Sequence, residues 1–208
     1  MLPSLHLIST GRQSFSELSS IVNTIQQSFD YLHVREKHRS PEEIYEGATH
    51  LIQNGFPKER LIINTHADVA TAIDAYGVHL PGDGLSVPKV KRTYPDLVVG
   101  TSVHSLGEAL DAEETGADYT MFGNLYSTPS KPGKSGKGVR ALTEITHHLH
   151  HPVIGIGGIT PERTSEVLST GVAGTAVMSG VLLSDDPKKA IYAYDKIRKG
   201  VHTNDSAL

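Results

Sequence analysis

Two pairs of small residues late in the chain have the composition and spacing of a phosphate-binding site. Gly157 and Gly158 close the apolar run PVIGIGGI, and Ser179 and Gly180 lie near the end of the run AGTAVMSGVL. A stretch with helical periodicity separates the runs, so each pair is expected at a strand-to-helix turn. Small residues let a ligand approach backbone N–H groups, which bind phosphate well where a helix begins. We therefore predict phosphate binding at these four residues; the alternative is two tight turns without a ligand.

Polar side chains recur at the ends of other apolar runs and are candidates for substrate contact. The segment HVREK follows one such run, and strand alternation places His33, Arg35 and Lys37 on one side. The alternative for Arg35 is a structural salt bridge. Candidates after later runs are Asn64, His66, Ser102, His104 and Asn124. His66 can also be read as a helix-start residue, and we expect His79, between apolar neighbours, to be a hydrogen-bonded core histidine.

One long irregular segment follows the sixth apolar run. It reads NLYSTPSKPGKSGKG and contains Thr128, Ser130 and Lys131 among three lysines, several glycines and two prolines. Long loops of this kind are often lids over an active site. We predict a lid over an anionic ligand; the alternative is a solvated loop. The histidine-rich run HHLHH at 147–151 closes a helix, where cationic side chains are favourable without a ligand, so we expect no metal site there.

Short apolar runs alternate with longer amphipathic stretches along the whole chain. Strands are expected at residues 5–9, 31–35, 61–64, 77–80, 98–103, 119–123, 153–157 and 173–178. Helices are expected to begin near Ser14, Pro41, Ala67, Val87, Leu106, Val139, Pro161 and Pro187. Eight alternating pairs predict an α/β fold, a single-domain (β/α)8 TIM barrel over residues 1–200 with a disordered tail at 201–208. An open doubly wound sheet would place a glycine-rich phosphate loop after its first strand, and Thr10–Gly11–Arg12–Gln13 has no such fingerprint.

Composition excludes several classes of protein. The 208 residues contain no cysteine, which rules out disulfides, thiolate metal sites and a cysteine nucleophile. The net charge of −4 and the scattered basic residues do not suggest a nucleic-acid partner. No apolar stretch approaches the roughly 20 residues of a membrane span. We expect a cytoplasmic protein with a small-molecule substrate and no membrane partner.

Seven segments in order resemble the thiamine phosphate synthase/TenI superfamily. They are HVREK at 33–37, INTHADVA at 63–70, GVHLPGDGLSV at 77–87, GTSVHSLGEA at 100–109, FGNLYSTPSKPG at 122–133, PVIGIGGI at 152–159 and VMSGVL at 177–182. The resemblance covers nearly the whole chain and implies the (β/α)8 barrel. It also implies that Gly157, Gly158, Ser179 and Gly180 bind phosphate, that Lys37 or Arg35 lies near a substrate carboxylate, and that a homodimer is possible.

The chain combines features of two branches of this superfamily. The synthase branch holds Mg²⁺ with aspartates at two positions that are Thr65 and Gly84 here, with Asp83 one residue early. Thr128, Ser130 and Lys131 match the pyrophosphate-binding pattern of that same branch. The histidine at position 33 resembles the TenI-like tautomerase branch, because the synthase branch has a glutamine there. The proton-shuttling histidine of the tautomerase branch, however, is replaced here by Asn124.

These departures lead to three hypotheses. The leading one is a TenI-like thiazole tautomerase, an isomerase of thiamine biosynthesis that aromatises a thiazole phosphate carboxylate tautomer and needs no metal or other cofactor. In it the proton transfer falls to His33, Glu36, His66, His104 or Lys131, with His104 and His66 having the most suitable pKa class. The second is a thiamine phosphate synthase that requires Mg²⁺. The third is a non-catalytic or regulatory barrel that binds a phosphate ligand.

Overall fold

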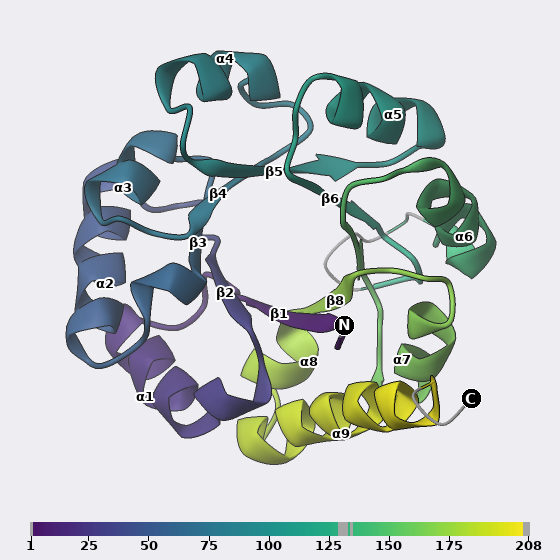
Figure 1. Cartoon of the computed structure of the whole chain (residues 1–208). Helices are drawn as coiled ribbons and strands as arrows, with labels where there is room; N and C mark the ends of the chain where they lie inside the picture. The colour runs from purple at the N-terminus through teal and green to yellow at the C-terminus, as the bar shows by residue number, and fades with distance from the viewer. Residues whose placement is uncertain (1, 129–132, 134, 206–208) are drawn as a thin grey trace.

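Eight parallel strands form a closed barrel with the helices outside it (Figure 1). The computed structural model describes residues 2–128, 133 and 135–205. Its strands are β1 (Ser4–Ile8), β2 (Tyr31–Val34), β3 (Leu61–Asn64), β4 (Gly77–Leu80), β5 (Val98–Val103), β6 (Tyr119–Gly123), β7 (Val153–Ile156) and β8 (Gly174–Val177). Each strand pairs with its sequence neighbours, and β1 pairs with β8 to close the ring. The predicted (β/α)8 barrel is confirmed.

The helices follow the strands in the expected alternation. They are α1 (Phe15–Ile25), α2 (Pro41–Gln53), α3 (Ala67–Ala72), α4 (Val87–Thr93), α5 (Leu106–Glu114), α6 (Gly138–His148), α7 (Pro161–Leu168), α8 (Ser179–Leu182) and α9 (Pro187–Asp205). Short 3-10 turns at Gln26–Ser28 and Lys58–Arg60 precede β2 and β3. The four-residue helix α8 was not predicted; it begins at Ser179, directly after β8.

Serine caps explain why two of the early helices begin where they do. Ser14 and Ser40 each accept the backbone N–H of a glutamate three residues later, and Glu17 and Glu43 reach back to the serine N–H groups. These reciprocal capping boxes satisfy donors that have no partner within the helix. Such local signals made the helix starts predictable.

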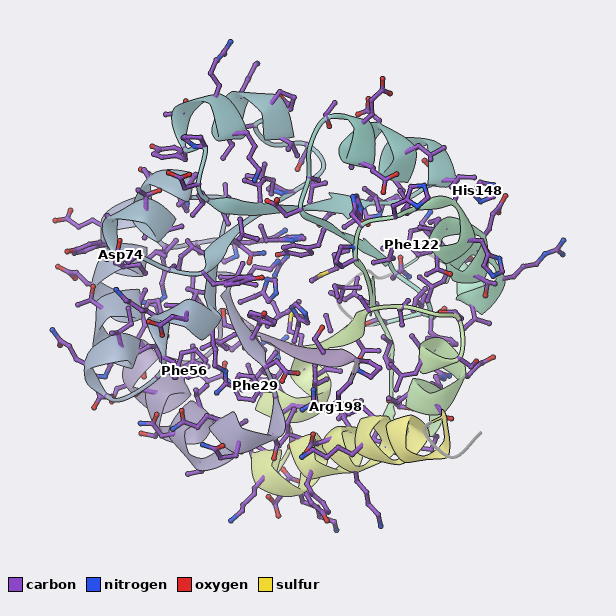
Figure 2. All side chains as sticks on the ribbon, in the orientation of Figure 1. Phe29, Phe56, Asp74, Phe122, His148 and Arg198 are labelled. Carbon is purple, nitrogen blue, oxygen red and sulfur yellow. The ribbon has the colours of Figure 1, made fainter. Side chains whose placement is uncertain are left out.

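Two apolar layers surround the strands. The larger lies between strands and helices and includes the stacked rings of Phe29 and Phe56 (Figure 2). The smaller fills the inside of the barrel with Ile8, Ile62, Tyr119, Met121, Ile154 and Ala176. Gly100 makes room for the Tyr119 ring, because a Cβ there would lie 2.0 Å from its Cζ. Three buried histidines share this interior: His6, His33 and His79.

The last helix closes the outside of the barrel next to β1. Arg198 of α9 is buried, donates to Asp195 at 2.8 Å and forms an ion pair with Asp30, and Figure 2 shows it facing the barrel wall. The helix continues to Asp205, five residues into the segment predicted to be a disordered tail. The helix thus crosses residue 200, where the sequence predicted the barrel to end, and the disordered tail stays a prediction. Among the described helices, none has the length and apolarity needed to cross a bilayer.

Candidate active site

Several of the predicted substrate-binding residues lie at or just after the carboxyl ends of their strands, which parallel pairing brings to one rim of the barrel. Asn64 ends β3, and Ser102 is next to last in β5. Asn124 follows β6, Gly157 and Gly158 follow β7, and Ser179 comes two residues after β8. This rim is the mouth of the candidate site, and the two glycine-containing turns form one side of it.

The turn after β7 requires glycine at both positions. Gly157 has φ +99° and Gly158 has φ +67°, a conformation that L side chains rarely adopt. A Cβ on Gly157 would lie 2.6 Å from Cβ of Asn124, and one on Gly158 would lie 2.8 Å from the carbonyl oxygen of Ser127. The chain leaves the strand at Gly157, so β7 ends one residue earlier than predicted.

The carbonyl groups of this turn face the protein. The Gly157 carbonyl accepts the N–H of Tyr126 at 2.9 Å, and the Gly158 carbonyl accepts Arg163 Nη1 at 2.9 Å. In a trans peptide the C=O and N–H point in opposite directions. The Gly158 N–H, which shares its peptide with the Gly157 carbonyl, therefore points away from Tyr126. An N–H in this position could bind an anion.

The second turn presents the start of α8. Ser179 and Gly180 open this helix, and the first N–H groups of a helix have no partner within it. Tyr194 of α9 connects the two turns. Its hydroxyl donates to the Ile159 carbonyl at 3.0 Å and would lie 3.1 Å from a Cβ on Gly180. Sequence reasoning missed Tyr194, because nothing in helix α9 marks a residue that contacts both turns.

A cluster of three side chains, Tyr126, Arg163 and Glu166, contacts the turn after β7. The Arg163 guanidinium lies 4.4 Å from the centre of the Tyr126 ring, whose hydroxyl donates to Glu166 at 2.7 Å. The same guanidinium bonds the Gly158 carbonyl. Arg163 therefore joins the loop after β6 to the glycine turn. These contacts were also missed, since Arg163 and Glu166 lie 37 and 40 residues after Tyr126 in the sequence.

We expect Arg163→Ala to weaken phosphate binding by about tenfold, because a lost charge-assisted hydrogen bond of this kind is worth about 1.5 kcal/mol or more. The fold should remain, since Arg163 is exposed. Affinity for thiazole phosphate can be measured by calorimetry. Arg140→Ala, which removes an exposed arginine of α6, is the matched control for charge. Equal affinities of the two variants would show that the contact with Gly158 does not support the site.

Asn124 has a structural role in the loop after β6. It is 4% exposed, and its Nδ2 donates to the Tyr126 carbonyl at 3.1 Å. Its own carbonyl accepts the N–H of Lys137 at 2.9 Å, which closes the base of the loop. Thr128 is half-buried, whereas Ser130 and Lys131 lie outside the described residues. The lid and the pyrophosphate contacts of this loop therefore stay predictions.

The end of β2 lies one residue earlier than predicted. The strand ends at Val34, so strand alternation no longer fixes where Arg35 and Lys37 lie relative to His33. His33 is fully buried, Arg35 is half-buried and Lys37 is exposed. Burial lowers the pKa of Arg35, and Glu36 raises it. Glu36 is buried and accepts Ser9 Oγ at 2.6 Å, which gives it a structural partner. Arg35 and Lys37 remain candidate contacts for an anion.

The remaining histidines occupy different environments. His79 is a hydrogen-bonded core residue, as predicted: Nδ1 lies 3.1 Å from Tyr119 Oη and Nε2 lies 2.9 Å from Ser102 Oγ. Its burial lowers its pKa to about 4. His104 is half-buried, with Nδ1 2.7 Å from the Gly123 carbonyl. His66 precedes α3 at the N-cap position, without a side-chain cap bond. The structure thus brings Asn64, His79 and Ser102 together on adjacent strands.

Comparisons with known proteins agree on the family. A family model described as thiamine monophosphate synthase matches residues 5–181. A thiamine-phosphate synthase of Pyrococcus furiosus is 35% identical over 189 residues, 90% of this chain and 91% of the relative. One of Clostridium acetobutylicum is 36% identical over 184 residues, 86% of this chain and 87% of the relative. A solved thiamine phosphate pyrophosphorylase from Pyrococcus furiosus superposes with a TM-score of 0.83 at 32% identity, covering 95% of this chain and 96% of that one.

These relatives contradict the leading hypothesis from the sequence. They bear the name of the synthase, a transferase, and not that of a tautomerase, so the assignment as an isomerase is wrong. That hypothesis gave too much weight to His33 and to the missing magnesium carboxylates. Matches along the whole length of the chain outweigh these single positions. By the family model and by these relatives, the chain belongs to the thiamine monophosphate synthase/TenI superfamily.

Proposed function

We propose that the chain is a thiamine-phosphate synthase, a transferase that joins hydroxymethylpyrimidine pyrophosphate to thiazole phosphate. The observation that carries this proposal is 35% identity to a protein of that name over 90% of the chain. The geometry of the mouth supports it, because the glycine turn after β7 and the start of α8 offer backbone N–H groups to a phosphate.

The reaction is a displacement at carbon. The thiazole ring nitrogen bonds to the methylene carbon of the pyrimidine while the bond from that carbon to the pyrophosphate oxygen breaks. The products are thiamine phosphate and inorganic pyrophosphate, and bond formation requires no proton transfer to or from the thiazole ring. A buried amide at Asn124, already bonded to Tyr126, is compatible with such a step.

The site residues then act as binding and orienting groups. Gly157, Gly158, Ser179 and Gly180 would hold the phosphate of the thiazole, which fixes the ring nitrogen relative to the pyrimidine. Negative charge grows on the pyrophosphate as it leaves, so donors and cations near it would stabilise the transition state. Candidates for that role from the other strand ends are Arg35, Lys37, Asn64, Ser102 and Thr128.

The described residues do not fit the magnesium site of the synthase branch. Mg²⁺ prefers carboxylate and water oxygens in octahedral geometry. The position expected to hold an aspartate after β3 is Thr65, an exposed residue with φ +74°. The second is Gly84, and its neighbour Asp83 is exposed. In the part of the chain that the structure describes, no three histidine or acidic residues are grouped to hold a metal. We therefore assign no step of the reaction to a metal.

The test is direct assay of the transferase reaction. Purified protein is incubated with both substrates, with and without Mg²⁺, and thiamine phosphate and pyrophosphate are measured. We expect both products in equal amounts, at a rate far above that without protein. Binding of both substrates without product in either condition would reject the transferase and favour a non-catalytic binding protein. A homodimer and a cytoplasmic location stay predictions.

A further inference from the structure

A row of polar side chains inside the barrel runs from the end where the strands begin, at Ser4, toward the mouth. Ser4 Oγ lies 3.0 Å from His6 Nε2, and His6 Nδ1 lies 2.9 Å from His33 Nε2. His6 is 4% exposed and His33 is 0% exposed. On β3 the partner of His33 is Ile62, so Asn64, two residues further, extends from the same face of the sheet. The row therefore continues from His33 to the mouth.

Two buried atoms at the end of this row lack partners. His33 Nδ1 and Asn64 Oδ1 have no hydrogen bond to any described residue. Buried polar atoms are rarely left unpaired, and one hydrogen bond between these two would satisfy both. Burial lowers the pKa of His33 well below 6.5, whereas an interaction with Asn64 raises it. An amide raises the pKa of a histidine when its oxygen accepts the ring N–H.

Such a bond would fix the proton positions along the whole row. A neutral imidazole carries one N–H. If His33 Nδ1–H donates to Asn64, then His33 Nε2 accepts from His6 Nδ1–H, and His6 Nε2 accepts the hydroxyl of Ser4. The Ser4 hydroxyl also donates to the Ala173 carbonyl at 3.2 Å, an oxygen that accepts the Ser4 N–H at 2.8 Å as well; His6 Nε2, at 3.0 Å, is the nearer acceptor for the hydroxyl. With Asn64 Oδ1 inward, as the buried atom, the opposite proton order would leave two acceptors facing each other at His33 and Asn64. That order fits only the reversed amide.

We propose that Ser4, His6 and His33 form a proton-ordered hydrogen-bond chain that holds the Asn64 carboxamide with Oδ1 inward and Nδ2 toward the mouth. An amide looks nearly the same from either end, so a hydrogen-bonding neighbour must choose its orientation. In this orientation Asn64 offers two N–H donors to a ligand. The reversed amide would offer a carbonyl oxygen, which repels an anion.

Asn64 is thus set as a donor to anionic oxygens, and His33 is its positioning residue. The inference rests on the proposed function only for the identity of the ligand, the pyrophosphate group. His33 itself does not reach the mouth, since it is fully buried. The sequence predicted that His33 contacts the substrate. We infer instead that His33 acts on the substrate only through Asn64.

Nitrogen-15 NMR of labelled histidines in the ligand-free protein tests the chain directly. Long-range proton–nitrogen spectra at pH 7.5 distinguish protonated from unprotonated ring nitrogens. We expect His6 and His33 both to carry their proton on Nδ1, with bare Nε2. A proton on Nε2 of His33 would overturn the inference. This result does not depend on substrate or turnover, so it is separate from the transferase assay.

Variants of Ser4 test the effect at the mouth. Ser4→Ala removes the donor at the start of the chain, whereas Ser4→Thr keeps the hydroxyl. We expect Ser4→Ala to give mixed tautomers at His6 and His33 and about tenfold weaker binding of inorganic pyrophosphate, as for one misdirected charge-assisted hydrogen bond. Ser4→Thr should keep the single tautomers of His6 and His33 and the affinity for pyrophosphate of the unaltered protein. Ser20→Ala, which removes an exposed hydroxyl of α1, is the control.

Unchanged pyrophosphate affinity in Ser4→Ala would overturn the positioning role. If the unaltered protein binds no pyrophosphate, the proposed function is in doubt. The histidine tautomers then still decide whether the proton-ordered chain exists.

Discussion

Gly158→Ala is expected to lower kcat/KM for thiamine phosphate formation by about 100-fold or more. The substitution forces an L side chain into φ +67° and brings its Cβ to 2.8 Å from Cβ of Tyr126 and from the Ser127 carbonyl. The turn or the loop must then move, and a displacement of about 1 Å in a binding group can cost about 100-fold in rate. We expect KM for thiazole phosphate to rise, because we propose that the moved N–H groups bind its phosphate.

Gly116→Ala is the matched control for this prediction. Gly116 has φ +89° and lies between α5 and β6, and a Cβ at this position would have no atom within 4 Å. The variant should lose about 1 kcal/mol of stability from the backbone conformation alone, with full activity. Steady-state kinetics and thermal unfolding of both variants separate the two effects. Normal activity of Gly158→Ala would show that this turn does not bind the phosphate.

The second large effect is the loss of stability in mild acid. Burial lowers the pKa of His6 to about 3 and that of His79 to about 4, and it lowers the pKa of His33 well below 6.5. Their rings stay neutral in the folded state, whereas the unfolded chain binds protons below pH 6.5. The free energy of unfolding therefore falls as the pH falls from about 6.5 toward the folded values.

The expected size follows from proton linkage. Each of these histidines removes about 2 kcal/mol between pH 7.5 and pH 5, so the three together remove about 6 kcal/mol. Because typical domains are stable by about 5–15 kcal/mol, much of the stability should be gone at pH 5. Carboxylates with lowered pKa, such as Glu113, begin to contribute only at lower pH.

Urea unfolding at pH 7.5, 6.5 and 5.5 measures this slope. His79→Gln removes one of the three groups and should reduce the slope by about a third, whatever its effect at neutral pH. His148→Gln, at an exposed position of α6, is the control for removing a histidine. A free energy of unfolding that is constant over this range would contradict the buried neutral histidines.

Local patterns explain why the fold was predictable. Strands of a parallel barrel are buried on both faces, so they appear as continuous apolar runs, and all eight lie within one residue of the expected bounds. A proline that follows a serine in α2 and a threonine in α7 marked the starts of these helices. Helix α8 was missed because four residues are too few for a helical period. The change at Gly157, from strand to positive φ, explains the early end of β7.

The site was predictable where it depends on backbone and not where it depends on tertiary contacts. The small residues at 157–158 and 179–180 identified both turns. By contrast, Tyr194 contacts Ile159 across 35 positions of sequence, and Arg163 contacts Tyr126 through a cation–π interaction. His6 lies in an apolar strand, where its bond to His33 has no local signal. The reaction was assigned incorrectly because single substitutions were weighed above similarity along the whole chain.

Binding of phosphate by main-chain amides is the central claim, and backbone NMR during titration with thiazole phosphate tests it most directly. We predict that the amide resonances of Gly157, Gly158, Ser179 and Gly180 shift together and saturate with one affinity, and that those of Gly55 and Gly116 stay fixed. If the ligand binds and these four resonances do not move, the phosphate is held elsewhere and the account is wrong.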